Sequence, residues 1–172
     1  MSARGDRVVA ALLIGTIGGI VATTAMTWTM DVMFRRLPKP YRYPLPPREL
    51  TERISAMAGV CPEPNDARLM TATLASHFGY GALTGAIFPL LMPTRRLLGA
   101  ASGISYGLAI WAISYLGWIP ALGILRPATE QPLRRNGLMI AAHIVWGSVL
   151  GFVAAGLSTA VTPFSNGPLR DR

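Results

Sequence analysis

Four long segments of this chain carry no charged residue, and each is long enough to cross a lipid bilayer. They are residues 8–30, 69–94, 97–125 and 136–169. A membrane-spanning helix needs about 20 mostly apolar residues, and each segment holds such a run. Four buried helices of a soluble bundle would show polar faces at a spacing of about 3.6 residues, which these segments lack. The sequence therefore predicts an all-α integral membrane protein with four transmembrane helices.

The expected architecture is a single membrane domain, a four-helix bundle over residues 1–172. Its spans are placed at about 8–34, 69–92, 97–118 and 137–162. With four spans, the N- and C-termini share one side of the membrane. Two long connections, at about 35–68 and 119–136, share the other side, and their prolines predict structured loops there.

The first long connection is predicted to hold a short amphipathic helix. Prolines cluster in YRYPLPPREL, residues 41–50, so the connection should begin in an extended conformation. Pro47 suits the first turn of a helix, and Gly59 suits its end. Leu50 and Ile54 fall on one face of that helix, which is typical of a helix that lies on the bilayer or against the bundle.

Two segments of the chain match each other without a gap. Residues 74–87, LASHFGYGALTGAI, align with residues 140–153, IAAHIVWGSVLGFV. The aligned pairs are His77 with His143, Tyr80 with Trp146, Gly81 with Gly147 and Gly85 with Gly151. A weaker match places GTIGGI, residues 15–20, over GAASGI, residues 99–104. This pattern predicts two related helical hairpins that run in the same direction, with a relating axis along the membrane normal.

Glycines recur at spacings of four residues within the predicted spans. Such small-residue rows let helix backbones approach closely in lipid, so these glycines are assigned to helix packing. They are Gly15, Gly19, Gly81, Gly85, Gly99, Gly103, Gly107, Gly147 and Gly151. The rows also suit contacts in a homo-oligomer or with another membrane protein.

A candidate polar site lies within the spans. His77 is nine residues past Arg68 and His143 is eight past Arg135, so at ~1.5 Å per residue both lie roughly 12–14 Å inward. The residues assigned to this site are His77, His143, Tyr80, Trp146 and Asp31.

Three interpretations of the two histidines are open from the sequence. The first is structural hydrogen bonding across helices, to Tyr80, Thr84 or Ser148, which is common in membrane bundles. The second is a proton or small-solute pathway, because ionisable residues within spans are costly and often functional. The third is a metal or haem site held by both imidazoles, for which no further ligand appears at a suitable spacing.

The long connections carry a second candidate site on their outer face. Its residues are Arg48, Glu49, Glu52, Arg53, Glu130, Arg134 and Arg135. The chain has a net charge of +8, and basic residues beside spans favour binding to anionic lipid headgroups. No basic helix interleaved with aromatics is present, so nucleic acid is not an expected partner.

No motif for catalysis or for a cofactor appears in the chain. There is no nucleotide loop, no Ser-His-Asp order, no paired-carboxylate motif and no zinc signature, and Cys61 is the single cysteine. No cofactor is predicted, and an enzyme is not favoured. The favoured function is a membrane module that binds a partner, a lipid or a small solute at the face covered by the two connections. The alternatives are a proton-coupled or small-solute transporter or channel that uses His77 and His143, and a bis-histidine metal or haem protein.

Several short blocks resemble a known family. PLPPR at 44–48 and AHIVW at 142–146 resemble the YagU-like family of small bacterial inner-membrane proteins. The blocks ASHFGYG and TEQP look like those of a group of uncharacterised bacterial multi-pass proteins close to that family. The resemblance implies a multi-pass protein of a bacterial inner membrane, with no established activity and no catalytic residues to transfer. It also implies a cytoplasmic N-terminus. The ten Lys and Arg residues on the side of the long connections, against six on the other, favour the opposite orientation.

Overall fold

The structure is a computed structural model that describes residues 3–60, 63, 66–92 and 99–161. All regular elements in this part of the chain are helical. They are α1 (Ala3–Arg36), the 3-10 turn η1 (Lys39–Tyr41), α2 (Pro46–Met57), α3 (Ala67–Leu91), α4 (Gly99–Ala112), the π-helix η2 (Ile113–Trp118), α5 (Ile119–Ala121), the 3-10 turn η3 (Ala128–Glu130) and α6 (Leu133–Val161).

Four helical spans in the described residues are long and apolar enough to cross a membrane. They are Arg4–Arg36, Ala67–Leu91, Gly99–Ala121 and Leu133–Thr159, the third being formed by α4, η2 and α5 together. The predicted all-α membrane bundle is therefore confirmed. At 34 residues, α1 is about 50 Å long, which exceeds a hydrocarbon core of ~30 Å. Its arginine-bearing ends therefore extend beyond the lipid tails.

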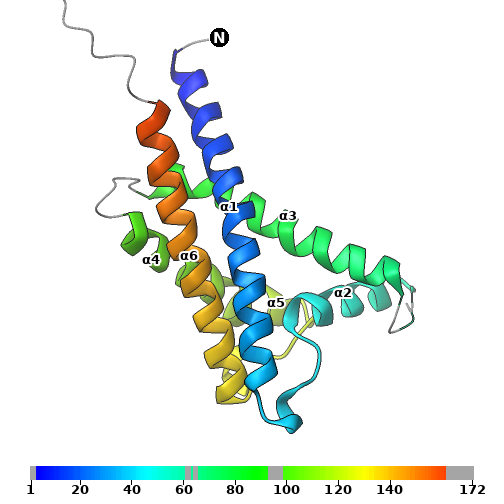
Figure 1. Ribbon diagram of the computed structural model, residues 1–172. Coiled ribbons are helices and arrows are strands. Elements are labelled where there is room, and N and C mark those ends of the chain that lie inside the picture. Colours follow the sequence, from blue (N-terminus) through cyan, green and yellow to red (C-terminus); the bar gives the residue numbers. More distant parts are fainter. Residues whose placement is uncertain (1–2, 61–62, 64–65, 93–98, 162–172) are drawn as a thin grey trace, which may run out of the picture.

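The four spans are arranged as two helix pairs joined along the centre. α1 and α6 lie side by side and run in opposite directions, with the start of α1 and the end of α6 at the same end of the bundle (Figure 1). α3 packs across α1, and α4 packs across α6. α3 and α4 contact each other through only a few side chains. The molecule therefore has one extensive interface between its two pairs, formed by α1 and α6.

Both helix pairs cross at glycines. A Cβ atom at Gly19 would overlap the carbonyl oxygen of Gly81 in the α1–α3 pair. A Cβ atom at Gly103 would overlap the carbonyl oxygen of Gly147 in the α4–α6 pair. The helix backbones thus touch directly at both crossings, as the glycine rows predict.

The buried core lies between α1 and α6 and is closed by side chains of α3 and α4. Phe88, Leu138 and Leu150 are the largest apolar side chains that are fully buried there. Met26 and Met30 of α1 belong to the same core, which accounts for the methionines at helical spacing in that span.

The first connection is structured by contacts with the end of α1. η1 interrupts the extended segment that the prolines predict. Arg42, just after η1, donates from Nε to the carbonyl of Leu37 and from Nη2 to the carbonyl of Arg35, both at 2.7 Å. These bonds satisfy carbonyls that the end of α1 leaves free.

α2 begins at Pro46, one residue before the predicted start. The chain turns away after it at Gly59, whose φ of +76° favours glycine.

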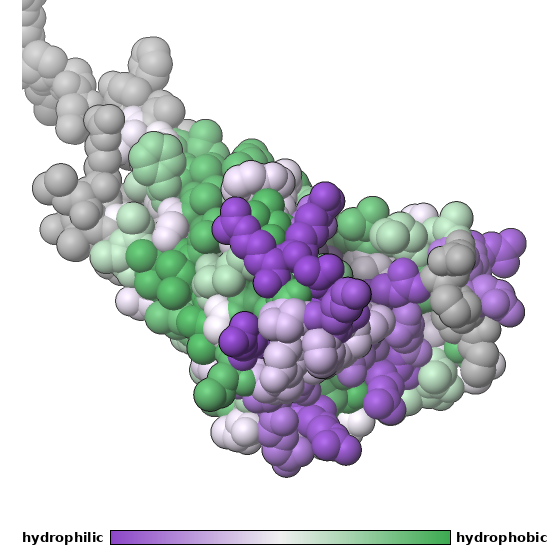
Figure 2. Space-filling model, turned by 60° about the horizontal axis from the view of Figure 1, so that its bottom comes forward, coloured by the Kyte–Doolittle hydropathy of each residue, from purple (hydrophilic) through white to green (hydrophobic). Residues whose placement is uncertain are grey.

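The two kinds of surface are separated along the molecule. Hydrophilic residues gather at the end that carries the connections, and hydrophobic residues cover the flanks of the spans (Figure 2). Exposed leucines, isoleucines and phenylalanines on the spans, such as Leu13, Leu83 and Phe152, form these flanks. Apolar flanks beside a polar end are the surface expected of helices that cross the hydrocarbon core of a bilayer.

Candidate functional site

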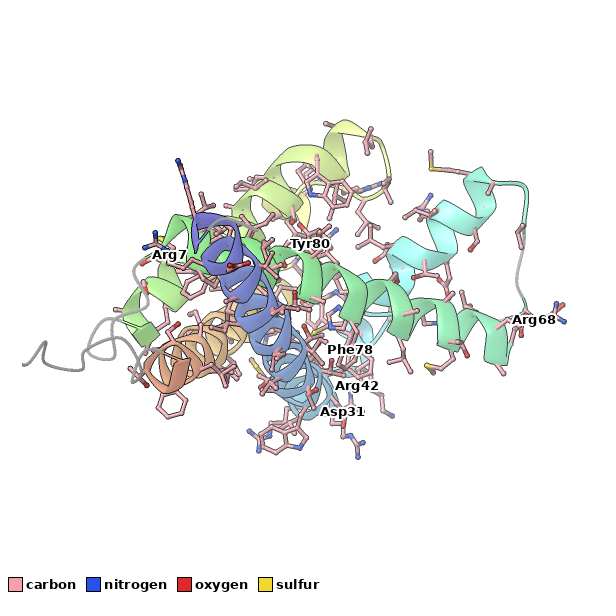
Figure 3. All side chains as sticks on the ribbon, turned by 90° about the horizontal axis from the view of Figure 1, so that it is seen from above. Arg7, Asp31, Arg42, Arg68, Phe78 and Tyr80 are labelled. Atoms are coloured by element: carbon pink, nitrogen blue, oxygen red, sulfur yellow. The ribbon has the colours of Figure 1, made fainter. Side chains whose placement is uncertain are left out.

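A cavity of about 420 Å³ lies between α2, α3, the η2 segment and α6. Its wall includes both intramembrane histidines, together with Tyr80 and Trp146. The structure therefore brings four of the five residues of the predicted polar site to one space. Asp31 is separate from this cavity. It lies near the C-terminal end of α1 and forms an exposed ion pair of 2.8 Å with Arg35 (Figure 3).

His77 contributes an unsatisfied polar atom to the cavity wall. Its Nε2 is buried and has no hydrogen-bond partner. Among the described residues, the only other buried side-chain nitrogen or oxygen in this state is Nε1 of Trp111, which does not line the cavity. Leaving such a group unpaired is costly, so an unpaired imidazole nitrogen beside a cavity indicates a missing partner.

His143 is buried on α6, with 6% of its surface exposed. Its Nδ1 lies 2.8 Å from the carbonyl oxygen of Met139, which can only accept a hydrogen bond, so Nδ1 is the donor. In the uncharged imidazole, Nε2 is then the acceptor. Tyr115 packs edge-on against this ring at a centroid distance of 6.0 Å. Neither histidine makes a hydrogen bond to another helix within the described residues, so the expected cross-helix bonds are not observed.

Tyr80 and Trp146 make the cross-helix hydrogen bonds instead. The Tyr80 hydroxyl lies 2.9 Å from Oγ of Ser114, which joins α3 to η2. Nε1 of Trp146 donates to Oγ1 of Thr23 over 3.1 Å, which joins α6 to α1. In each case an aromatic residue from the second helix of one pair contacts a hydroxyl from the first span of the other pair.

Three aromatic rings close the inner end of the cavity. Phe88 and Tyr106 lie one helical turn beyond the lining residues Thr84 and Ile110. The Tyr106 ring lies 5.3 Å from the Phe88 ring and 6.1 Å from the Trp146 ring, centroid to centroid. The Tyr106 hydroxyl donates to the carbonyl oxygen of Thr84 over 2.7 Å. This cluster separates the cavity from the opposite end of the bundle.

Replacing Tyr106 by phenylalanine should lower the free energy of unfolding by about 0.5–1.5 kcal/mol, because one buried hydrogen bond is lost while the ring packing is kept. Unfolding in detergent micelles, followed by circular dichroism, measures the change. Tyr41→Phe is the control, since its hydroxyl makes no hydrogen bond within the described residues. Equal stability of the two variants would contradict the role of the Tyr106 hydroxyl.

The π-helix η2 supplies wall residues that the sequence did not identify. Ser114, Tyr115 and Trp118 all line the cavity from this segment. The backbone of Gly117 leaves the helical region, with φ of −111° and ψ of −107°, and kinks the span. π-helical turns are frequent at functional sites because they re-aim side chains. The sequence does carry one indication of this irregular segment, because Gly117 and Pro120 both disfavour a regular α-helix.

α2 forms the remaining wall, with its apolar face toward the cavity. Leu50 and Ile54 line the cavity, and the hydroxyl of Thr51 lies 3.3 Å from that of Ser76 on α3. The amphipathic helix is thus a side wall of the cavity and packs against α3.

The residues of the predicted loop-face site do not form one site. Arg48 pairs with Glu52 along α2 at 2.8 Å. Glu49, Arg53 and Glu130 line a second, polar cavity of about 480 Å³ between α2 and the second connection. Arg134 is exposed on the first turn of α6.

Arg135 is buried, with 5% of its surface exposed, and it binds the first connection. Its guanidinium donates to the carbonyl oxygens of Tyr41, Tyr43 and Pro44 at 3.2, 2.9 and 2.8 Å. The same group lies 3.5 Å from the centre of the Tyr43 ring. Arg135 is therefore a structural clamp between α6 and the first connection.

No metal centre is found in the part of the chain that the structure describes, because no three His, Cys, Asp or Glu side chains are grouped to hold an ion. The fold and the cavity define a small four-span membrane protein with a partly open, mostly apolar site. Residues 42–152 match the family described as "Protein of unknown function (DUF1440)", and the chain belongs to this family. No curated protein and no solved structure matches the chain. The matched residues include the whole cavity wall except Thr23 and Met26 of α1.

Proposed function

We propose that this protein binds a small membrane-soluble molecule in the cavity between α2, α3, η2 and α6. The observation that carries the proposal is the unpaired Nε2 of His77 in the wall of an apolar cavity of about 420 Å³. Binding sites for small molecules are typically apolar cavities of about 300–1,000 Å³ with a few polar groups. The cavity meets this description within the family-matched part of the chain.

The proposed route of entry is from the lipid, between α3 and the α4–η2 span. These helices contact each other through only a few side chains, among them Tyr80 and Ser114. The opposite route is blocked by the cluster of Phe88, Tyr106 and Trp146. A molecule dissolved in the bilayer therefore has a shorter path to the cavity than a solute from the far aqueous side.

Native mass spectrometry of the detergent-solubilised protein tests this proposal through the small molecules that co-purify with it. Ala72 lines the cavity from α3, whereas Ala75 on the same helix does not. We expect Ala72→Trp to lose the bound mass by about tenfold, because the indole fills the cavity, and Ala75→Trp to keep it. A wild-type protein with no bound mass, or equal loss in both variants, would contradict the proposal.

A second candidate function is proton-coupled or small-solute transport, which is supported by His77 and His143 lining the same cavity. Reconstituted protein in liposomes that contain a pH-sensitive dye tests it. Transport predicts a proton flux that His77→Gln and His143→Gln abolish, whereas a pure binding protein gives no flux in any form.

The chain is proposed to consist of two related hairpins in a bacterial inner membrane. The two glycine crossings support this, since Gly19 meets Gly81 and Gly103 meets Gly147 at the positions that the sequence match pairs. The YagU-like blocks support the location. Exposed arginines at the polar end, such as Arg35 and Arg134, are proposed to contact anionic headgroups. An alkaline phosphatase fusion after residue 172 reports the side of the C-terminus.

A further inference from the structure

We infer that the ligand of the apolar cavity is an uncharged molecule whose flat ring carries hydrogen-bonding oxygens, the chemistry of an isoprenoid quinone. This inference rests on the proposed function and names the class of molecule that the site takes. It is carried by the charge, the ring content and the hydrogen-bonding groups of the cavity wall.

The wall of the cavity contains no Asp, Glu, Lys or Arg side chain. The charged residues of α2 lie elsewhere: Glu49 and Arg53 line the polar cavity, while Leu50 and Ile54 line the apolar one. A carboxylate or phosphate in the apolar cavity would have no side chain of opposite charge, and an unpaired buried charge is very costly. The wall therefore favours an uncharged head group over a fatty acid or a phospholipid head.

Aromatic rings surround the cavity on several sides. Those in its wall are His77, Tyr80, Tyr115, Trp118, His143 and Trp146. They come from α3, η2 and α6, and two of the contacts between them have centroid distances of 6.2 Å (Tyr80 and Trp118) and 6.0 Å (Tyr115 and His143). Aromatic faces and edges pack well against another flat ring. A site lined by rings from three helical elements favours a planar head over a flexible chain.

The two imidazoles offer complementary hydrogen bonds to oxygens on a ring. Nε2 of His77 has no partner in the protein, and in the tautomer with a proton at Nε2 it donates to a carbonyl oxygen. His143 has its Nδ1–H bound to Met139, so its Nε2 accepts a bond from a hydroxyl. A quinone presents carbonyl oxygens at opposite edges of its ring, and its reduced form presents hydroxyls at the same positions. The reduced form suits both imidazoles at once, because one hydroxyl donates to Nε2 of His143 and the oxygen of the other accepts from Nε2 of His77. The oxidised form bonds His77 alone, because its carbonyl oxygens and Nε2 of His143 are all acceptors.

Binding of decylubiquinone, a quinone with a short tail, tests this inference directly. Trp118 and Trp146 lie in the wall, so a bound quinone should quench tryptophan fluorescence. Native mass spectrometry of the solubilised protein counts the bound molecules and is repeated with 1-decanol and with decanoic acid, which have the same tail length and no ring. We expect decylubiquinone to bind and the two chain compounds to bind at least about tenfold more weakly.

Substitutions at His77 show whether the bound quinone uses the inferred group. We expect His77→Leu to weaken decylubiquinone binding by about tenfold, because the hydrogen bond is lost in a buried site. His77→Gln, which keeps a donor, should retain part of the affinity and serves if the leucine variant does not fold. Trp111→Phe is the matched control, since it removes the other unpaired buried N–H, away from the cavity, and should leave binding unchanged.

The outcomes separate the ligand class from the proposed function. Tighter binding of decanol or decanoic acid, blocked by Ala72→Trp, overturns the quinone class and leaves a lipid-binding cavity in place. Quinone binding that neither His77 variant alters overturns the assigned hydrogen bond. Failure of all three probes to bind, with no co-purified molecule, overturns both proposals.

Discussion

A leucine at Gly147 is expected to prevent the α4–α6 pair from assembling. At this position a Cβ atom would overlap the backbone carbonyl of Gly103, and a backbone cannot rotate away as a side chain can. Overpacking in a folded core costs about 1–3 kcal/mol, and the loss should be larger here because helices in lipid associate through such close contacts. We therefore expect the unfolding free energy to fall by more than about 3 kcal/mol. Size-exclusion chromatography and unfolding in mixed micelles measure the loss.

Gly156 provides the matched control for this substitution. It lies on the same helix, it is exposed, and a Cβ atom there meets nothing within 4 Å. Gly156→Leu should fold like the wild-type protein, since leucine is a better helix former than glycine and faces the lipid. Equal losses in the two variants would show that a leucine on α6 destabilises the protein wherever it lies, which would contradict the crossing as the cause.

Replacing Arg135 by methionine is expected to free the first connection from the bundle. The substitution removes three hydrogen bonds to carbonyl oxygens and the contact with the Tyr43 ring, and it leaves those carbonyls without their partner. A bond to a charged donor is worth about 1.5–3 kcal/mol, and bonds that share one guanidinium do not add fully, so we expect a loss of at least about 3 kcal/mol. Limited trypsin digestion should then cut the connection at Arg42 and Arg48, and we expect the wild-type protein to resist cleavage at both residues.

Arg134 is the neighbouring control for Arg135. It is exposed and makes none of these bonds, so Arg134→Met should leave the cleavage at Arg42 and Arg48 as in the wild-type protein. Arg135→Lys should give an intermediate result, because an ammonium group cannot reach three carbonyls in the fixed geometry of a guanidinium. Unchanged protection in Arg135→Met would overturn the assignment of this residue as the clamp.

The spans could be predicted from the sequence because a bilayer constrains them strongly. Charge-free length fixed the four helices, and α2 was predicted to within one residue by Pro47 and Gly59. The glycine rows indicated the crossings, since close backbone approach is what those residues permit. The spans, α2 and the crossings depend on local composition or on a repeated residue spacing, and both can be read from a single sequence.

The cavity and the clamp could not be predicted in the same way. Arg135 resembles any basic residue beside a span, and its carbonyl partners are 91 to 94 residues away in the chain. The π-helical turn at Gly117 brings Ser114 and Trp118 to the cavity through a backbone change that apolar periodicity does not encode. Asp31 was grouped with the histidines by its place near a span end, but its side chain is exposed and pairs with Arg35 on the surface of α1. The cavity, the clamp and the position of Asp31 all depend on how elements that are distant in the sequence pack against each other.

The unequal contacts between the helix pairs have a consequence for any molecule in the cavity. α1 and α6 pack tightly along the centre, whereas α3 and α4 leave the space that becomes the cavity. An occupant would therefore act as a wedge that holds α3 and the α4–η2 span apart. The size of the occupant would then set the lateral width of the bundle at its polar end, so the bundle would be wider with a molecule bound than without one.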